Sequence, residues 1–125
     1  MKKYTKDHEW IMEDDNGAVV GITDYAQKQL GDVVYVSLTG EVGDEVSAGD
    51  DIAEIESVKS VSQIYAPIDC KISGFNSDLE DESNCAIINE DPYGKGWILK
   101  IEISDKSQLD GLMDEKDYLS FIETL

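Results

Sequence analysis

The stretch IAEIESVKSVSQIY, residues 52–65, has two short strand-like runs on either side of a turn. The runs Ile52–Glu56 and Val61–Tyr65 are rich in β-branched and apolar residues and are too short for typical helices. The turn between them has neither Asn-Gly nor Asp-Gly, and Lys59 is the only long side chain in it. We therefore predict a β-hairpin with Lys59 near its tip, where side chains project into solvent.

The charge around this turn is strongly negative. Lys59 is the only base between Lys28 and Lys71. The thirteen residues from 44 to 56 hold six acids, which are Asp44, Glu45, Asp50, Asp51, Glu54 and Glu56. Lys59 is therefore interpreted either as a surface lysine that softens acidic repulsion or as a lysine presented to a modifying enzyme. The small and β-branched neighbours of Lys59 favour the second interpretation.

Outward from this hairpin, the sequence continues to indicate short strands. Glycines punctuate residues 40–74 at a spacing typical of a small sandwich or barrel. An Asn-Gly pair within residues 14–17 predicts the turn of another hairpin, which spans His8–Ile22. Between the two hairpins we expect a helix at Asp24–Leu30, with Thr23 as its N-cap and Gly31 as its stop, followed by a strand at Val33–Leu38.

The last third of the chain changes from strand to helix. An exposed connection is expected at residues 78–84, and then a strand at Trp97–Ile103 whose odd-numbered residues share one face. Ser104 and Asp114 are candidate caps for helices in an extension of about residues 104–125. There the residues Tyr118, Phe121, Ile122 and Leu125 form one apolar stripe. This stripe either packs on the β core or binds a partner. We predict one domain over residues 1–125.

Composition excludes several classes of function. The chain has 125 residues, with 28 acids and 10 bases, and a formal net charge of −18. Such a surface disfavours nucleic acid and anionic membranes as partners. No apolar run approaches the length of a membrane span. Two distant cysteines, Cys70 and Cys85, and one histidine, His8, form no recognised metal site or catalytic triad. We expect a cytoplasmic protein with reduced thiols that is not an enzyme.

Five segments together resemble the H-protein family of the glycine cleavage system, and they stand in the family's order. They are KYTKDHEW at residues 3–10, GITDYAQKQLGDVVYVSL at 21–38, EVGDEVSAGD at 41–50, ESVKSVS with the following YAP at 56–67, and NEDPYGKGWILKI at 89–101. The resemblance implies a mainly β barrel-sandwich hybrid, as in biotinyl and lipoyl carriers, with short flanking helices and a C-terminal helix. It also implies that lipoic acid is attached covalently to Lys59.

The resemblance further implies a carrier function within a multienzyme system. The aminomethyl group of glycine would pass from the pyridoxal-phosphate glycine decarboxylase, the P protein, to the tetrahydrofolate-dependent aminomethyltransferase, the T protein. Electrons would pass to dihydrolipoamide dehydrogenase, the L protein. A lipoate ligase or a lipoyl/octanoyl transferase would load the lysine. Such a carrier catalyses none of these reactions itself.

Three further positions acquire tentative roles from the resemblance. Glu56 matches the modification motif and is either a recognition residue for the lipoylating enzyme or an exposed strand acid. Glu9 matches a residue of the cleft that holds the loaded arm, and is otherwise a charge at a strand edge. Gln63 stands in the cleft where the family usually has Asp. Two other departures are Tyr25, where His is usual, and Asp69-Cys70, where Ser-Gly is usual.

Two alternatives remain beside the glycine cleavage carrier. A relay protein that donates lipoyl groups to other complexes would have nearly the same sequence. An unmodified acidic binding module would keep the fold, and Lys59 would then be dispensable. A biotin carrier is disfavoured, because Val58-Lys59-Ser60 replaces the Met-Lys-Met expected at such a tip.

Overall fold

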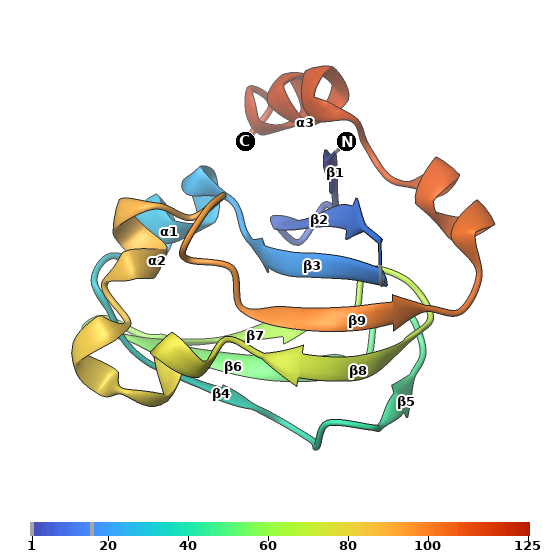
Figure 1. Cartoon of the computed structure of the whole chain (residues 1–125). Coiled ribbons are helices and arrows are strands. Elements are labelled where there is room, and N and C mark those ends of the chain that lie inside the picture. Colours follow the sequence, from blue (N-terminus) through green and yellow to red (C-terminus); the bar gives the residue numbers. More distant parts are fainter. Residues whose placement is uncertain (1, 16) are drawn as a thin grey trace.

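Two antiparallel β-sheets share one core in the computed structural model, which describes residues 2–15 and 17–125 (Figure 1). The larger sheet has the order β1-β2-β3-β9-β8-β5, and the smaller has the order β4-β6-β7. The strands are β1 Lys2–Tyr4, β2 Glu9–Asp14, β3 Gly17–Ile22, β4 Val33–Leu38, β5 Glu45–Val46, β6 Asp51–Ser57, β7 Val61–Tyr65, β8 Cys70–Phe75 and β9 Leu99–Ile103. The mainly β architecture predicted from the sequence is confirmed.

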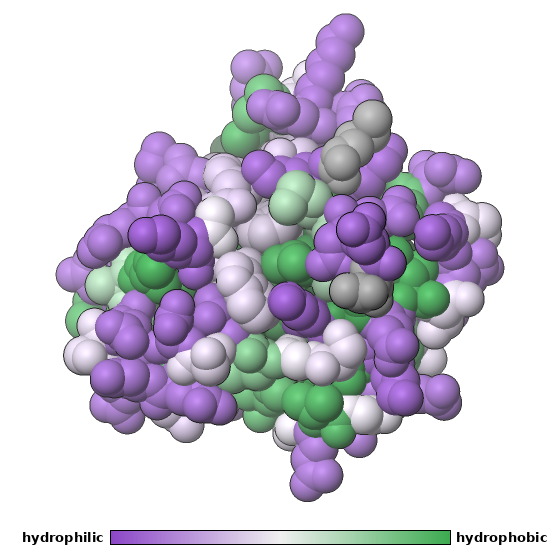
Figure 2. Space-filling view, viewed as in Figure 1, coloured by the Kyte–Doolittle hydropathy of each residue, from purple (hydrophilic) through white to green (hydrophobic). Residues whose placement is uncertain are grey.

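Alternation along the strands builds the core between the sheets. In the small sheet Val36 pairs with Ile55, and both side chains are at most 2% exposed. Val20 and Leu99 pair in the large sheet and are fully buried. Because strands turn alternate residues inward, these positions form the core and the outward positions carry most of the polar side chains. Figure 2 shows this result, with hydrophilic residues over most of the visible face and smaller hydrophobic areas between them.

Both predicted hairpins are present. Strands β2 and β3 pair from Glu9 opposite Ile22 to Asp14 opposite Gly17. The predicted Asn-Gly turn includes Asn16, which lies outside the described residues. Strands β6 and β7 pair with Glu56 opposite Val61, so that residues 57–60 form the turn around Lys59.

The helices are short and surround the sheets. Helix α1, Asp24–Leu30, begins and ends as predicted, because the Thr23 hydroxyl accepts a hydrogen bond from the Ala26 amide at 3.2 Å and Gly31 has a φ of +78°. The other helices are α2 Ile87–Glu90 and α3 Glu115–Ile122, with 3₁₀ turns at Ser77–Glu80, Glu82–Asn84 and Lys106–Gly111. Within the described part of the chain, no helix is long and apolar enough to cross a membrane.

Two expectations about the middle of the chain need correction. The connection at residues 78–84 is exposed as expected except at Leu79, because it forms 3₁₀ turns that bury this one side chain completely in the core. The alternation of Leu99, Ile101 and Ile103 against Lys100 and Glu102 is confirmed, but the expected start of this strand at Trp97 is wrong. The strand begins only at Leu99, and Ile98 is fully buried while its amide donates to the Val20 carbonyl at 2.9 Å. In both places one apolar side chain reaches the core from outside a strand.

The predicted C-terminal caps and stripe are partly correct. Asp114 caps α3 as predicted, since its side chain accepts a hydrogen bond from the Asp117 amide at 2.8 Å. Ser104 is not a cap, because Asp105 caps the 3₁₀ turn Lys106–Gly111 that follows it. The apolar stripe ends early, because α3 stops at Ile122 and Leu125 is 62% exposed.

Helix α3 packs on the N-terminal strands, in agreement with the first of the two interpretations of its apolar stripe. The Tyr118 ring stacks on Tyr4, with centroids 4.8 Å apart and planes 9° apart. The Tyr118 hydroxyl lies 2.7 Å from the hydroxyl of Thr23 and 2.8 Å from Nδ1 of His8. The C-terminal helix is therefore attached both to β1 and to the N-cap of α1, and it lies above β1 in Figure 1.

Replacing Tyr118 with Phe tests this attachment. The substitution removes a buried hydroxyl and leaves Thr23 and His8 without their partner, so we expect the free energy of unfolding to fall by about 1 to 2 kcal/mol. Urea denaturation measures this change. The same substitution at the exposed Tyr35 is the matched control and should leave stability nearly unchanged. Equal stability of the two variants would show that the Tyr118 hydroxyl does not hold the helix.

Candidate functional site

The turn that carries Lys59 is organised by Ser57 rather than by glycine. The Ser57 amide donates to the Ser60 carbonyl at 2.8 Å. The Ser57 hydroxyl in turn accepts hydrogen bonds from the amides of Lys59, at 3.2 Å, and Ser60, at 3.1 Å. A serine hydroxyl can close a tight turn in this way, which explains how the tip forms without Asn-Gly. Lys59 is exposed at this tip, as the sequence predicted.

Backbone contacts tie the tip to the connection between α1 and β4. The Val58 amide donates to the Asp32 carbonyl at 3.0 Å. The Lys59 side chain lies across Gly31, so that a Cβ at residue 31 would sit 3.0 Å from Lys59 Cε and 3.5 Å from Nζ. Gly31 therefore has two functions. It ends helix α1 with a positive φ, which the sequence indicated, and it leaves space for the lysine side chain, which the sequence did not indicate.

Asn89 in α2 holds the segment on which Lys59 lies. Its Nδ2 donates to the Gly31 carbonyl and to Oε1 of Gln27, each at 2.9 Å. Its Oδ1 accepts a hydrogen bond from the Val33 amide, also at 2.9 Å. One side chain thus joins the end of α1 to the start of β4, on both sides of Asp32. Asn89 is the first residue of the segment NEDPYGKGWILKI, and nothing in the sequence indicates this bridging function.

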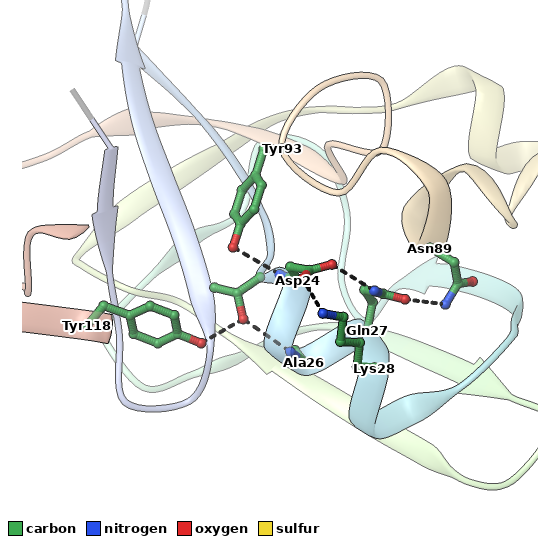
Figure 3. A network of polar contacts seen from close by, with 8 residues as sticks. Asp24, Ala26, Gln27, Lys28, Asn89, Tyr93 and Tyr118 are labelled. Atoms are coloured by element: carbon green, nitrogen blue, oxygen red, sulfur yellow. Dashed lines mark hydrogen bonds and ion pairs between the residues drawn. The ribbon is translucent and has the colours of Figure 1, made fainter. Parts of the chain in front are cut away.

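Tyr93, in the same segment of residues 89–101, contacts the N-terminal end of α1. Figure 3 shows Gln27 reaching from Asn89 back to Asp24, where Nε2 donates to Oδ1 at 2.8 Å. The Tyr93 hydroxyl accepts a hydrogen bond from the Asp24 amide at 3.0 Å. Lys28 adds an ion pair with Asp24 at 3.0 Å. These hydrogen bonds from Gln27 and Lys28 lower the pKa of Asp24 and favour its charged form.

A cleft of about 310 Å³ lies beside α1 and β7. Its lining includes Glu9 and Gln63, which the structure therefore brings to one site. Helix α1 contributes Tyr25, Ala26, Gln29 and Leu30, the last of which directly precedes Gly31. Lys59 thus rests at one end of the helix that forms a wall of this cleft. The Tyr25 ring contacts His8, with centroids 4.6 Å apart.

A larger hollow of about 890 Å³ lies elsewhere, between α1 and α3. Its walls include Tyr4, Tyr93 and Tyr118. Neither Lys59 nor the two cleft residues Glu9 and Gln63 line it, so size alone does not identify the site that serves the lysine.

Glu9 is a buried carboxylate and not a charge at an exposed strand edge. Its side chain is 2% exposed. The Thr5 hydroxyl donates to Oε1 at 2.7 Å, and the Tyr65 amide donates to Oε2 at 3.1 Å. Burial raises the pKa of Glu9 to about 7, although both hydrogen bonds oppose the shift. Near neutral pH this carboxyl therefore exchanges a proton, and it also links strand β2 to the edge strand β7.

Gln63 borders the cleft from the edge strand β7, in the outward row with Glu54, and Glu56 lies on the solvent side of the small sheet. With its amide nitrogen facing Asp51, Gln63 Nε2 lies 2.8 and 3.1 Å from the two carboxylate oxygens. The Gln63 carbonyl oxygen is then free of that carboxylate. Glu56 is half-buried, pairs with Tyr35 on one side and Val61 on the other, and lies three residues before Lys59. The roles of both residues stay predictions.

The two cysteines are unpaired and buried. Burial raises the pKa of the Cys70 thiol to about 11, and it also raises that of Cys85. A thiol with a raised pKa contains little of the nucleophilic thiolate at neutral pH. Asp69, beside Cys70, accepts hydrogen bonds from the Ala48 amide and the Gln108 side chain, so the departure at residues 69–70 is accommodated in the fold.

A small β protein with an exposed lysine at the tip of a hairpin has the architecture of a lipoyl carrier, and comparisons agree with this class. The crystal structure of a glycine cleavage system H protein from Mycobacterium marinum matches 98% of this chain and 96% of that protein, with a TM-score of 0.80 and 35% identity. The predicted carrier-type fold, with flanking helices and a C-terminal helix, is therefore confirmed.

Sequence relatives make the assignment more specific. The family described as glycine cleavage H-protein matches residues 2–125. The glycine cleavage system H protein of Thermotoga maritima is 53% identical, with coverage of 97% of this chain and 95% of the relative. That of Carboxydothermus hydrogenoformans is 48% identical, with coverage of 97% and 91%. The chain belongs to the glycine cleavage H-protein family, and its role is that of a lipoyl-carrying H protein. The relay and the unmodified module are not favoured.

The raised pKa of Glu9 predicts how stability depends on pH. Since the folded pKa of about 7 exceeds the ordinary value of 4.5, the contribution of Glu9 to stability is complete below pH 4.5 and is lost as pH rises through 7. Between pH 5 and 8, the free energy of unfolding of the wild type should fall by about 2 kcal/mol more than that of Glu9→Gln. Urea denaturation at several pH values measures the difference.

A carboxyl at an exposed position supplies the control for this measurement. Glu123→Gln, beyond the end of α3, should keep the wild-type pH dependence. If Glu9→Gln and the wild type lose stability in parallel, the Glu9 proton is not bound more tightly in the folded state.

The three hydrogen bonds of Asn89 give a second prediction. Asn89→Ala removes all of them, so we expect a loss of about 3 kcal/mol in the free energy of unfolding. In this variant we also expect amide hydrogen exchange to accelerate at Val33 and Gly31 but not in the core of β6. Asn84→Ala, in an exposed 3₁₀ turn, is the matched control and should change neither quantity. If exchange at Val33 is unchanged in Asn89→Ala, the Asn89 side chain does not hold the end of α1 to the start of β4.

Proposed function

We propose that Lys59 is the attachment residue for lipoic acid in this chain, through an amide at Nζ. The observation that carries the proposal is the position of Lys59 at an exposed hairpin tip, clamped by Val58 to Asp32 and resting on Gly31. The missing Cβ of Gly31 provides a cradle for a long side chain beside the cleft. These features fit a lysine that must be reached by an enzyme and then bear a flexible arm.

The lysine itself supplies the nucleophile for attachment. Its ammonium group must lose a proton before Nζ can form the amide bond with an activated acyl group. The leaving group departs from the acyl carbon in the same exchange. Because the amide is neutral, the formal net charge changes from −18 to −18 − 1 = −19. A lipoate ligase or a lipoyl/octanoyl transferase supplies this reaction in our proposal.

The bound group would supply a redox-active disulfide that accepts the aminomethyl group and electrons. We propose that the cleft beside α1 receives this arm, with Glu9 and Gln63 as its polar contacts. Each Glu9 oxygen already accepts one hydrogen bond and retains a lone pair for another. A cationic amine near Glu9 would favour the ionised carboxyl and lower its pKa from about 7. Glu9 can thereby hold a loaded amine and shield it from water.

A carrier that moves between enzymes must bind each of them in turn. We propose that the chain docks in turn with the P, T and L proteins of the glycine cleavage system, and that it performs no catalysis itself. A net charge of −18 suits electrostatic steering toward basic docking faces, an effect that weakens as salt concentration rises. We also propose a cytoplasmic location, which is supported by two buried, unpaired thiols suited to a reducing compartment.

Replacing Lys59 with Arg tests the proposed function. Arginine keeps the positive charge and the length of the side chain but offers no amine that forms this amide. We expect Lys59→Arg to retain the wild-type circular dichroism and unfolding midpoint, while glycine cleavage with the P, T and L proteins falls at least a hundredfold. Lys71→Arg, at a half-exposed lysine of β8, is the matched control and should retain full activity. Glycine cleavage at the wild-type rate by Lys59→Arg would refute the assignment.

A further inference from the structure

The outer face of the small sheet concentrates the exposed apolar residues of the protein. Eight large apolar side chains are exposed among residues 2–15 and 17–125, and five of them lie on β4, on β7 or on the turn of Lys59. These five are Val34, Tyr35, Val58, Val61 and Tyr65. Single exposed apolar residues are ordinary, but a group of them beside a functional residue indicates an interaction surface.

Strand register places three of the outward side chains in one row. Tyr35 on β4 pairs with Glu56 on β6, and Glu56 pairs with Val61 on β7. The neighbouring row of Val36, Ile55 and Ser62 faces the other way, toward the core and the cleft. Tyr35 and Val61 thus flank Glu56 on the solvent side, with exposures of 40% and 55%. We call Tyr35, Glu56 and Val61 the outer row.

The outer row is the part of this face nearest to Lys59. Glu56 and Val61 are the first cross-strand pair below the turn of residues 57–60. The turn itself adds Val58, which is 67% exposed and directly precedes the lysine. A protein that closes over Lys59 therefore meets Val58 and the outer row together.

The charge of this region defines the chemistry of a partner. Residues 33–65 contain seven acids, and Lys59 is their only base. On the outer face, Glu54 lies in the row next to Glu56, opposite Ser37 and Gln63. An apolar pair with Glu56 between its members and Glu54 in the next row is complementary to an apolar surface that carries Lys or Arg. Tyrosine is also enriched among residues that dominate binding energy at interfaces.

We propose that the apolar pair Tyr35 and Val61 of the outer row, together with Val58, forms the docking surface for the enzyme that acylates Lys59, an inference that rests on the proposed attachment at this residue. To form an amide at Nζ, that enzyme must hold the lysine at its own reacting atoms. It must therefore cover the surface immediately around the tip. Enzymes that act later react at the far end of a flexible arm, so they do not require contact with the tip.

Steady-state acylation of the unmodified protein tests the docking surface. A purified lipoate ligase is supplied with ATP and lipoate, and the rate is measured against the concentration of the carrier. We expect Tyr35→Thr combined with Val61→Thr to raise KM at least tenfold with kcat nearly unchanged, because threonine suits a strand but removes the apolar contact. Glu56→Gln should weaken the salt dependence of kcat/KM.

Val42→Thr is the matched control for the apolar substitutions. Val42 is 57% exposed and follows β4 at the end opposite the Lys59 turn, because Val33 pairs with Ser57 and Leu38 with Ala53. We expect its kinetic constants to stay within twofold of the wild type. Circular dichroism and unfolding midpoints verify that all variants fold.

The outcomes separate this proposal from the proposed function. If the folded double variant is acylated with the wild-type kcat/KM while Lys59 is modified in both, the docking surface is wrong and the attachment site stands. If the wild type is not acylated at Lys59, the proposed function itself fails. A third outcome is a double variant that is acylated normally but loses activity with the P, T and L proteins once it is fully acylated. In that case the surface binds those enzymes, and the acylating enzyme is the wrong partner.

Discussion

The hydrogen bonds of Asn89 are the constraint on which the presentation of Lys59 depends. They hold the Gly31 carbonyl and the Val33 amide at fixed positions, and Asp32 between them accepts the Val58 amide. The hairpin tip is thereby supported from outside its own sheet, by a residue that lies thirty positions further along the chain. An isolated two-stranded hairpin has little stability alone, so this external support gives the lysine a defined origin.

Two kinds of carboxylate serve two purposes in this protein. The exposed acids around the small sheet set the field that a partner meets, and that field weakens with salt. Glu9 is buried, holds two hydrogen bonds and exchanges a proton near pH 7. The fold separates these functions by placing the acidic face outside the small sheet and Glu9 in the cleft beside β7.

Local chemistry predicted most of the fold, whereas long-range contacts decided the details of the site. Capping by Thr23 and the stop at Gly31 gave the bounds of α1, and alternation gave the strands around Lys59. The burial of Glu9 and the bridging by Asn89 depend on residues more than fifty positions away, which periodicity does not report. The family resemblance brought Glu9 and Gln63 to notice, and the cleft places them together.

Peptide mapping of the acylated protein shows directly which lysine carries the lipoyl group. The full chain is treated with a lipoate ligase, ATP and lipoate, and its intact mass and proteolytic fragments are measured beside Lys59→Arg. We predict one lipoyl group per chain, located on Lys59 and absent from the other nine lysines. An adduct on another lysine, or no adduct while a control acceptor is modified, would contradict the account.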